Sequence, residues 1–315
     1  MTLVVAASSR DSIWMLTDRR LSYGKVKPPT DKAHKVMVLQ ATDGVAILGY
    51  SGLGATNADT EPADWMSRVI RGRNLTLDAY LKAIADAAVR ELPFYLSHLR
   101  DPRHTIVVPA IVGRKVRIYS IELNFDRSKK ECTVQRKLNV YKIPTGALVP
   151  LRVFAAGSGM KYLPKEQSHA RWLFRLLKAT DRGRMTPERM AQEFAKLNYE
   201  VHVKAAREEE PPTVGRSCIV VWRYRKGGAH GNGHRFFTDM CPDANTPTLP
   251  SIGWGGMDME AFHNATFPPS AELLIKQLEA FEQGRDPNQI DTKEYQAKID
   301  GALATLKYAP DERLR

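Results

Sequence analysis

The chain opens with the apolar run TLVVAA at residues 2–7, directly after the initiator Met1. A second apolar run, SIWMLT at residues 12–17, follows a short polar break and ends at Asp18. Two apolar runs this close together predict neighbouring strands of one sheet, and their continuous apolar character indicates burial of both faces. If the two strands pair, Asp18, which stands sixteen positions after Thr2, returns to the start of the first strand.

Thr2 carries two reactive groups once Met1 is removed. Its α-amine and its β-hydroxyl would then belong to one residue at the start of a buried strand. An α-amine has a reference pKa of about 7.7–8.0, so a fraction of it is neutral near pH 7 and can accept the hydroxyl proton. Such a threonine needs no histidine, only nearby cations and hydrogen bonds that keep the amine neutral. The sequence therefore offers Thr2 as a candidate nucleophile.

Further features follow in a fixed order. Lys35 stands directly before a third apolar run, VMVL at residues 36–39. A fourth run at residues 44–49 leads into YSGLG at residues 50–54, and GSG occupies residues 157–159. Each feature alone is common, since a lone lysine is usually solvated and glycines often mark turns. Their order and spacing together are informative.

In that order and spacing, the chain resembles the proteasome β-subunit and its bacterial relatives among the N-terminal-nucleophile (Ntn) hydrolases. The resemblance implies that Thr2 is the nucleophile and that Asp18 and Lys35 form the charged pair beside it. It also implies that the backbone N–H of Gly52 forms an oxyanion hole and that Ser158 orients the α-amine.

The resemblance extends to supporting residues and to a substrate pocket. Arg20 matches the arginine of the family's Asp-x-Arg motif, and Ser217 matches a further serine near the site. The acidic residue that the family has three positions before this serine is Val214 here, which departs from the pattern. The implied pocket residues are Leu21, Ala33, Tyr50 and Gly54. Tyr50 would narrow this pocket and favour small or medium substrate side chains.

The remaining sequence alternates between strand and helix patterns. Helices are expected after Thr60 and Thr76, at residues 167–178 and after Thr186, where threonines provide N-caps. Strands are expected at residues 105–112, 115–123, 132–138, 152–156, 217–224 and 234–238. We therefore predict an α+β fold, and the resemblance implies a four-layer αββα sandwich of two mainly antiparallel sheets.

The C-terminal quarter of the chain has a different composition. Residues 242–269 are rich in Pro, Gly, Asn and Thr and are predicted to be irregular, with helices expected at residues 270–283 and 291–306. We predict an Ntn-hydrolase-like domain at residues 1–240 and a C-terminal helical extension at residues 241–315.

Composition limits the class of protein. The chain has 315 residues, of which 43% are hydrophobic and 26% charged, as in a globular protein with a sizeable core. No apolar stretch approaches the length of about eighteen residues that a membrane span needs, and no secretion signal is expected at the N-terminus. Three scattered cysteines predict reduced thiols and a cytoplasmic protein. No cofactor is expected, and His230, His234 and Asp239 lack a regular metal-ligand spacing.

The net charge of +12 is spread along the chain, and no nucleic-acid-binding motif accompanies it, so nucleic acid is not expected as a partner. The leading hypothesis is a threonine-nucleophile hydrolase of peptides or small amides that assembles as a homo-oligomer, as its relatives do. The sequence leaves a partner ATPase open. The alternative hypothesis is a non-catalytic assembly or scaffold subunit that retains the fold.

Overall fold

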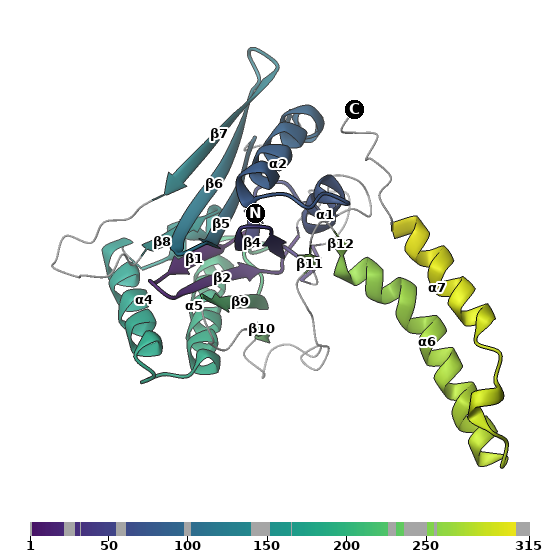
Figure 1. Ribbon diagram of the computed structural model, residues 1–315. Coiled ribbons are helices and arrows are strands. Elements are labelled where there is room, and N and C mark those ends of the chain that lie inside the picture. Colours follow the sequence, from purple (N-terminus) through teal and green to yellow (C-terminus); the bar gives the residue numbers. More distant parts are fainter. Residues whose placement is uncertain are drawn as a thin grey trace.

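The computed structural model describes residues 2–21, 29–31, 33–54, 61–97, 102–139, 152–164, 166–225, 231–235, 251–254 and 257–306. Within these residues the strands form two sheets (Figure 1). The first sheet has the order β10-β9-β2-β1-β8, and all of its neighbouring strands are antiparallel. Its strands are β1 (Val4–Ser8), β2 (Ser12–Asp18), β8 (Arg152–Ala156), β9 (Cys218–Tyr224) and β10 (Gly231–Arg235).

The second sheet has the order β12-β11-β3-β4-β5-β6-β7. Its strands are β3 (Val36–Ala41), β4 (Gly44–Ser51), β5 (Arg103–Val112), β6 (Lys115–Asp126), β7 (Glu131–Asn139), β11 (Ser251–Trp254) and β12 (Met257–Asp258). Neighbouring strands are antiparallel except for β11, which runs parallel to β3.

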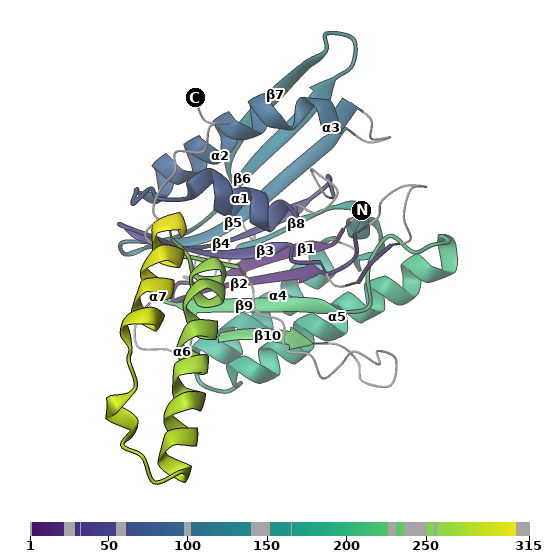
Figure 2. The same ribbon diagram turned by 90° about the vertical axis from the view of Figure 1, so that its right-hand side faces the viewer.

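Helices cover the outer faces of both sheets. One face carries α1 (Pro62–Ile70) and α2 (Leu77–Glu91), with α3 (Pro93–Ser97) beside them. The other face carries α4 (Glu166–Asp181) and α5 (Pro187–Glu208), as Figure 2 shows from the side. A short 3-10 helix, Ser158–Tyr162, follows β8.

The core consists of three apolar layers, and the first strands show why. Side chains alternate along a strand, so Val5 and Ala7 face α4 and α5, whereas Val4 and Ala6 face the second sheet. The same holds for β2, where Trp14 and Leu16 point to the helices. Burial on both faces explains the continuous apolar runs and confirms the predicted four-layer α+β arrangement.

Local signals predicted several element boundaries. Thr76 caps α2 by accepting the Ala79 N–H, and Thr186 caps α5 by accepting the Arg189 N–H. A tight turn at Gly113 joins β5 and β6, as predicted. β10 begins three residues before the predicted strand, of which residues 236–238 lie outside the described residues, as does Thr60. The expectation that Thr60 caps the first helix is wrong, because the N-cap of α1 is Glu61, whose N–H donates to the Asp64 carboxylate.

The prediction that residues 242–269 are irregular is wrong where the structure describes them. Residues 251–254 form β11, which pairs with β3, a strand more than two hundred positions earlier in the chain. Helix α6 (Met259–Glu282) begins well before the expected position and continues through Pro268 and Pro269. The strand was missed because its partner, β3, is distant in the sequence, and the helix start was missed because Pro268 and Pro269 were interpreted as a break that the helix does not make.

Helix α6 packs along α7 (Lys293–Leu306), joined by the short 3-10 helix Pro287–Gln289. This helical pair extends beyond the sandwich in both views (Figures 1 and 2). No helix within the described ranges combines the length and the apolar character needed to cross a bilayer. The domain boundary at residue 240 remains a prediction, and β11 joins the main sheet beyond it.

Candidate active site

Strand register brings Asp18 to Thr2. In the β1–β2 pair, Val4 lies opposite Thr17, so the next residue along β2 faces the residues before β1. The Asp18 N–H donates to the Leu3 carbonyl at 3.0 Å, and the Leu3 N–H donates to Asp18 Oδ1 at 2.8 Å. The sixteen-residue separation seen in the sequence is therefore the consequence of one antiparallel pairing.

Lys35 reaches the same point from the second sheet. Its Nζ donates to Thr2 Oγ1 at 2.8 Å and to Asp18 Oδ1 at 3.0 Å. The side chains of Lys35 and Asp18 are wholly buried, and Thr2 is only 3% exposed. Loss of hydration lowers the pKa of the Lys35 ammonium, and the negative charge of Asp18 opposes that shift.

Asp18 is held by backbone donors as well as by Lys35. Its Oδ2 accepts the N–H groups of Arg20 and Gly215, each at 3.0 Å. A buried carboxylate is stable only when hydrogen bonds and an opposite charge replace its lost hydration. Together these contacts give each carboxylate oxygen of Asp18 two hydrogen-bond donors. Of the four donors, only the Lys35 ammonium is cationic.

The backbone of the GSG segment packs against Thr2. The Gly159 N–H donates to the Thr2 carbonyl at 3.2 Å. Gly157 has φ +98°, and a Cβ on it would lie 2.0 Å from the same carbonyl oxygen, so only glycine fits there. The Ser158 hydroxyl oxygen is buried and has no hydrogen-bond partner among the described residues. The structure thus places Ser158 between two glycines that touch Thr2.

Gly52 follows β4 in a conformation that also favours glycine, with φ +120° and a Cβ position 2.3 Å from the Arg103 carbonyl oxygen. The neighbouring Ser51 hydroxyl lies 2.9 Å from the Cβ position of Gly157, the glycine that packs on Thr2. This contact brings the end of β4 to the Thr2 region.

Arg20 and Ser217 are near the cluster, but their side chains bind other groups. The Arg20 Nε lies 3.2 Å from Asp31 Oδ1, and its Nη1 donates to the Pro212 carbonyl at 3.1 Å. The Ser217 hydroxyl donates to the Asp31 carbonyl at 3.1 Å. Both side chains therefore hold the segment around Asp31, and only the backbone N–H of Arg20 contacts Asp18.

Three of the four predicted pocket residues are buried, namely Leu21, Ala33 and Tyr50. Leu21 exchanges backbone hydrogen bonds with Thr30, and the Tyr50 N–H donates to the Lys35 carbonyl at 3.2 Å. Gly54 is partly exposed. Tyr50 thus contacts Lys35 directly, and Ala33 stands two positions before Lys35 in the chain. The role of all four residues as pocket walls stays a prediction.

His104 supports the segment that contains Gly52 and was not anticipated from the sequence. Its Nδ1 accepts the Leu53 N–H at 3.1 Å, and its ring stacks on that of Tyr50 with centroids 5.7 Å apart. Accepting at Nδ1 fixes the neutral tautomer with the proton on Nε2. Complete burial lowers the pKa of His104 to about 4.

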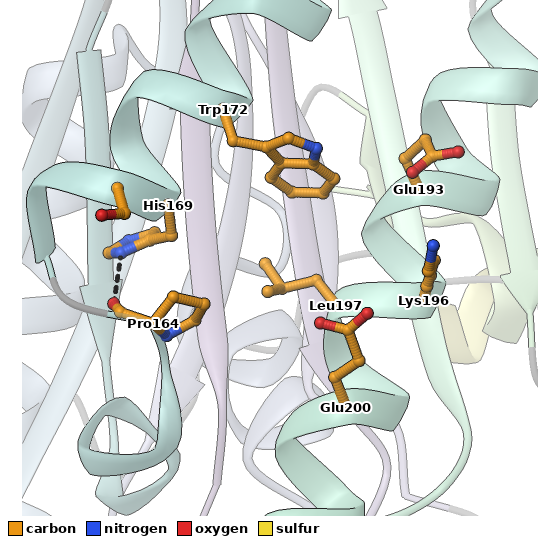
Figure 3. A pocket seen from close by; sticks show the side chains of 8 residues that line it. Pro164, His169, Trp172, Glu193, Lys196, Leu197 and Glu200 are labelled. Atoms are coloured by element: carbon orange, nitrogen blue, oxygen red, sulfur yellow. Dashed lines mark hydrogen bonds between the residues drawn. The ribbon is translucent and has the colours of Figure 1, made fainter.

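A cavity of about 300 Å³ lies between α4 and α5, as Figure 3 shows. Trp172 and Leu197 form apolar walls, and Glu193, Lys196 and Glu200 lie on the α5 side. None of the predicted site residues lines this cavity, so it is separate from the Thr2 cluster. Within the described residues, no group of His, Cys, Asp and Glu is arranged to hold a metal ion.

Comparison with known proteins gives structural likeness only. No protein-family model matches the sequence, and no curated protein matches it either. An Anbu mutant from Hyphomicrobium sp. strain MC1 is 16% identical with a TM-score of 0.43, covering 76% of this chain and 89% of that chain.

The Anbu complex from Pseudomonas aeruginosa, solved as a helical assembly, is 13% identical with a TM-score of 0.45, covering 76% of this chain and 88% of that chain. Eukaryotic HslV from Trypanosoma brucei is 13% identical with a TM-score of 0.32, covering 70% of this chain and 98% of that chain. Values this low do not establish a shared activity.

Proposed function

We propose that the chain is an N-terminal threonine hydrolase that cleaves a peptide or small amide after removal of Met1. One observation carries the proposal: Lys35 Nζ lies 2.8 Å from Thr2 Oγ1 and 3.0 Å from the buried Asp18 carboxylate. A cation beside the hydroxyl favours the developing alkoxide, and its charge disfavours protonation of the nearby amine.

The proposed reaction uses Thr2 twice. Its Oγ attacks the amide carbonyl while its α-amine takes the hydroxyl proton, which then passes to the departing amine as the C–N bond breaks. Water next gives a proton to the α-amine and attacks the resulting ester, releasing the acid and restoring the hydroxyl. In this scheme Asp18 holds Lys35 in place, and the Gly52 N–H stabilises the oxyanion. The Ser158 hydroxyl, which is buried and has no hydrogen-bond partner in the described part of the chain, is assigned to the α-amine.

Mass spectrometry with a peptidyl epoxyketone tests this proposal, since that electrophile bonds to both the hydroxyl and the α-amine. We expect the purified chain to lack Met1 and to gain one adduct at Thr2. Thr2→Ala should fold and gain none, because it has no hydroxyl. Thr2→Ser should still react, and Ser9→Ala, which removes another buried hydroxyl from the β1–β2 hairpin, should react like the unmodified sequence.

Retention of Met1 without any adduct would overturn the proposal, because the general base would then be missing. That outcome would favour the non-catalytic assembly subunit.

Homo-oligomer formation is a second part of the proposal. Several large apolar side chains of α6 are more than half exposed, namely Phe267, Leu274, Ile275, Leu278 and Phe281. Exposed apolar patches of this kind often mark protein interfaces. Light scattering of the purified chain measures its oligomeric state, and a monomer would refute this part alone.

A further inference from the structure

The segment at residues 213–217 is part of the environment of Asp18. The Gly215 N–H donates to Asp18 Oδ2 at 3.0 Å, although the two residues are almost two hundred positions apart in the chain. This contact requires close backbone approach, since a Cβ on Gly215 would lie 2.9 Å from both Arg20 Cβ and Asp31 Oδ1. A small shift of this segment would therefore remove one donor from the carboxylate that pairs with Lys35.

Two side chains of α5 hold this segment by three consecutive carbonyl groups. Asn198 Nδ2 donates to the Gly215 carbonyl at 3.0 Å and to the Arg216 carbonyl at 2.9 Å. His202 Nδ1 donates to the Val214 carbonyl at 2.7 Å. The two residues are four positions apart on the helix, so they share one face, and both are buried.

The donor role of His202 follows from its second nitrogen. Its Nε2 accepts the Arg216 Nε–H at 3.3 Å, so the proton of the neutral ring is on Nδ1, facing the Val214 carbonyl. Burial is the main cause that lowers the pKa of His202, and the positive charges of Arg216 and Arg20 also lower it. The hydrogen bond to the Val214 carbonyl and the negative charge of Asp31 oppose this shift in pKa without reversing it. The neutral donor form is therefore the one that the surroundings favour.

Val214 fills apolar space beside the Thr2 region. A Cβ on Gly159 would lie 2.8 Å from Val214 Cγ2 and 3.0 Å from Leu3 Cβ, so these residues are in close packing next to Thr2. The departure of Val214 from an acidic residue thus leaves no charge there. The contact with the site is made instead by the backbone of the following residue, Gly215.

We propose that Asn198 and His202 are positioning residues for the hydrolysis, acting by holding residues 213–217 so that the Gly215 N–H donates to Asp18. This inference rests on the proposed function for its chemical consequence. The anchoring itself does not depend on that function and can be measured separately.

The full-length chain with three substitutions tests the proposal. Asn198→Leu keeps the branched shape and the number of side-chain heavy atoms and removes both donors. His202→Asn keeps a donor near the position of Nδ1, whereas His202→Gln keeps an acceptor near Nε2 and withdraws the donor. His169→Asn is the matched control, because His169 is equally buried at 6% exposure and its Nδ1 contacts the Pro164 carbonyl at 3.2 Å, away from this segment (Figure 3).

Two measurements are made on each variant. Deuterium exchange of the peptide containing Gly215 reports the anchoring, and inactivation by a peptidyl epoxyketone separates the maximal rate, kinact, from the half-saturating concentration, KI. For Asn198→Leu we expect faster exchange at Gly215 and a fall of about tenfold in kinact, the effect of losing one well-placed hydrogen bond, with KI unchanged. His202→Gln should shift both measurements in the same direction, while His202→Asn and His169→Asn should resemble the unmodified chain.

Unchanged exchange at Gly215 in both Asn198→Leu and His202→Gln would overturn the anchoring. Faster exchange with an unchanged kinact would overturn the positioning role. If the unmodified chain forms no adduct, the proposed function fails, whereas the exchange measurement still decides whether α5 anchors the segment. If Asn198→Leu does not fold, His202→Gln is the milder change and still tests the proposal by both measurements.

Discussion

The two ends of the β1–β2 hairpin carry similar groups in different surroundings. At the open end, Thr2 and the carboxylate of Asp18 share the buried ammonium of Lys35. At the turn, Ser9 and Ser12 donate hydroxyl hydrogen bonds to Asp181 Oδ1 at 2.9 and 3.3 Å. Both ends therefore combine hydroxyl groups with one aspartate.

What differs is the cation and the degree of burial. Asp18 is wholly buried and receives three backbone N–H groups in addition to Lys35, whereas Asp181 is at the surface and its carboxyl is only partly withdrawn from water. The Ser12 hydroxyl also accepts the Trp14 Nε1–H at 3.0 Å, so the cluster at the turn fixes the turn and the indole. Of these two hydroxyl–aspartate clusters, and within the described part of the chain, only the one at Thr2 has a buried cation beside the hydroxyl, as the proposed function requires.

The largest expected effect comes from Asp18→Asn. This change leaves the Lys35 ammonium buried without its counter-charge, so we expect the free energy of unfolding to fall by about 3–5 kcal/mol. Formation of the epoxyketone adduct should also be lost. Urea denaturation and mass spectrometry measure the two effects.

The matched control for this prediction is the double variant Asp18→Asn with Lys35→Met, which removes both charges. It should be more stable than Asp18→Asn alone, because no unpaired ion remains in the core. Strictly additive losses from the two substitutions would show that the charges are not coupled.

A smaller effect concerns His104, beside the Gly52 segment. Its folded-state pKa of about 4 lies below the unfolded value of about 6.5, so the unfolded chain binds more protons between these values. Its contribution to stability is therefore complete above about pH 6.5 and declines by up to about 3 kcal/mol as the pH falls to about 4. His104→Asn keeps an acceptor for the Leu53 N–H and should lose this dependence.

Urea denaturation of both forms at pH 7 and pH 4.5 measures the difference. An equally steep fall in the His104→Asn variant would assign the acid sensitivity to other groups.

The smallest effect is expected from Asp181→Asn. Partial withdrawal from water raises the pKa of the Asp181 carboxyl, so its ionised form is disfavoured by folding. Its contribution has the opposite sign to that of His104, since stability falls as the pH rises through this raised pKa. At pH 7 the substitution should change the free energy of unfolding by no more than about 1 kcal/mol and leave adduct formation intact. A loss as large as that of Asp18→Asn would contradict the distinction between the two ends.

Local sequence signals were sufficient for much of the fold. The continuous apolar runs predicted strands buried on both faces, and Thr76 and Thr186 predicted the starts of α2 and α5. These features succeed because caps and periodic patterns act over a few residues. Residues 251–254 could not be predicted in this way, because their strand depends on pairing with β3.

The residues of the candidate site also divide into those that the sequence indicated and those that it did not. Asp18 was expected near Thr2 because antiparallel pairing converts a fixed separation in sequence into proximity in space, whereas the place of Lys35 beside them was implied by the resemblance to Ntn hydrolases. His104, Asn198 and His202 gave no comparable signal, since each acts on backbone groups of a segment that only folding brings near.

The two buried strands, the hydroxyl of Thr2 at their start and the charged residues that follow can all be inferred from the amino-acid sequence. Three other features become visible only in the folded chain. The Gly215 N–H donates to Asp18, the side chains of Arg20 and Ser217 bind around Asp31, and α5 holds residues 214–216. The two groups of features differ in the range of the interactions that produce them. Strand patterns and caps are local, whereas hydrogen bonds around a buried charge are made with whichever backbone groups the packed layers bring within reach.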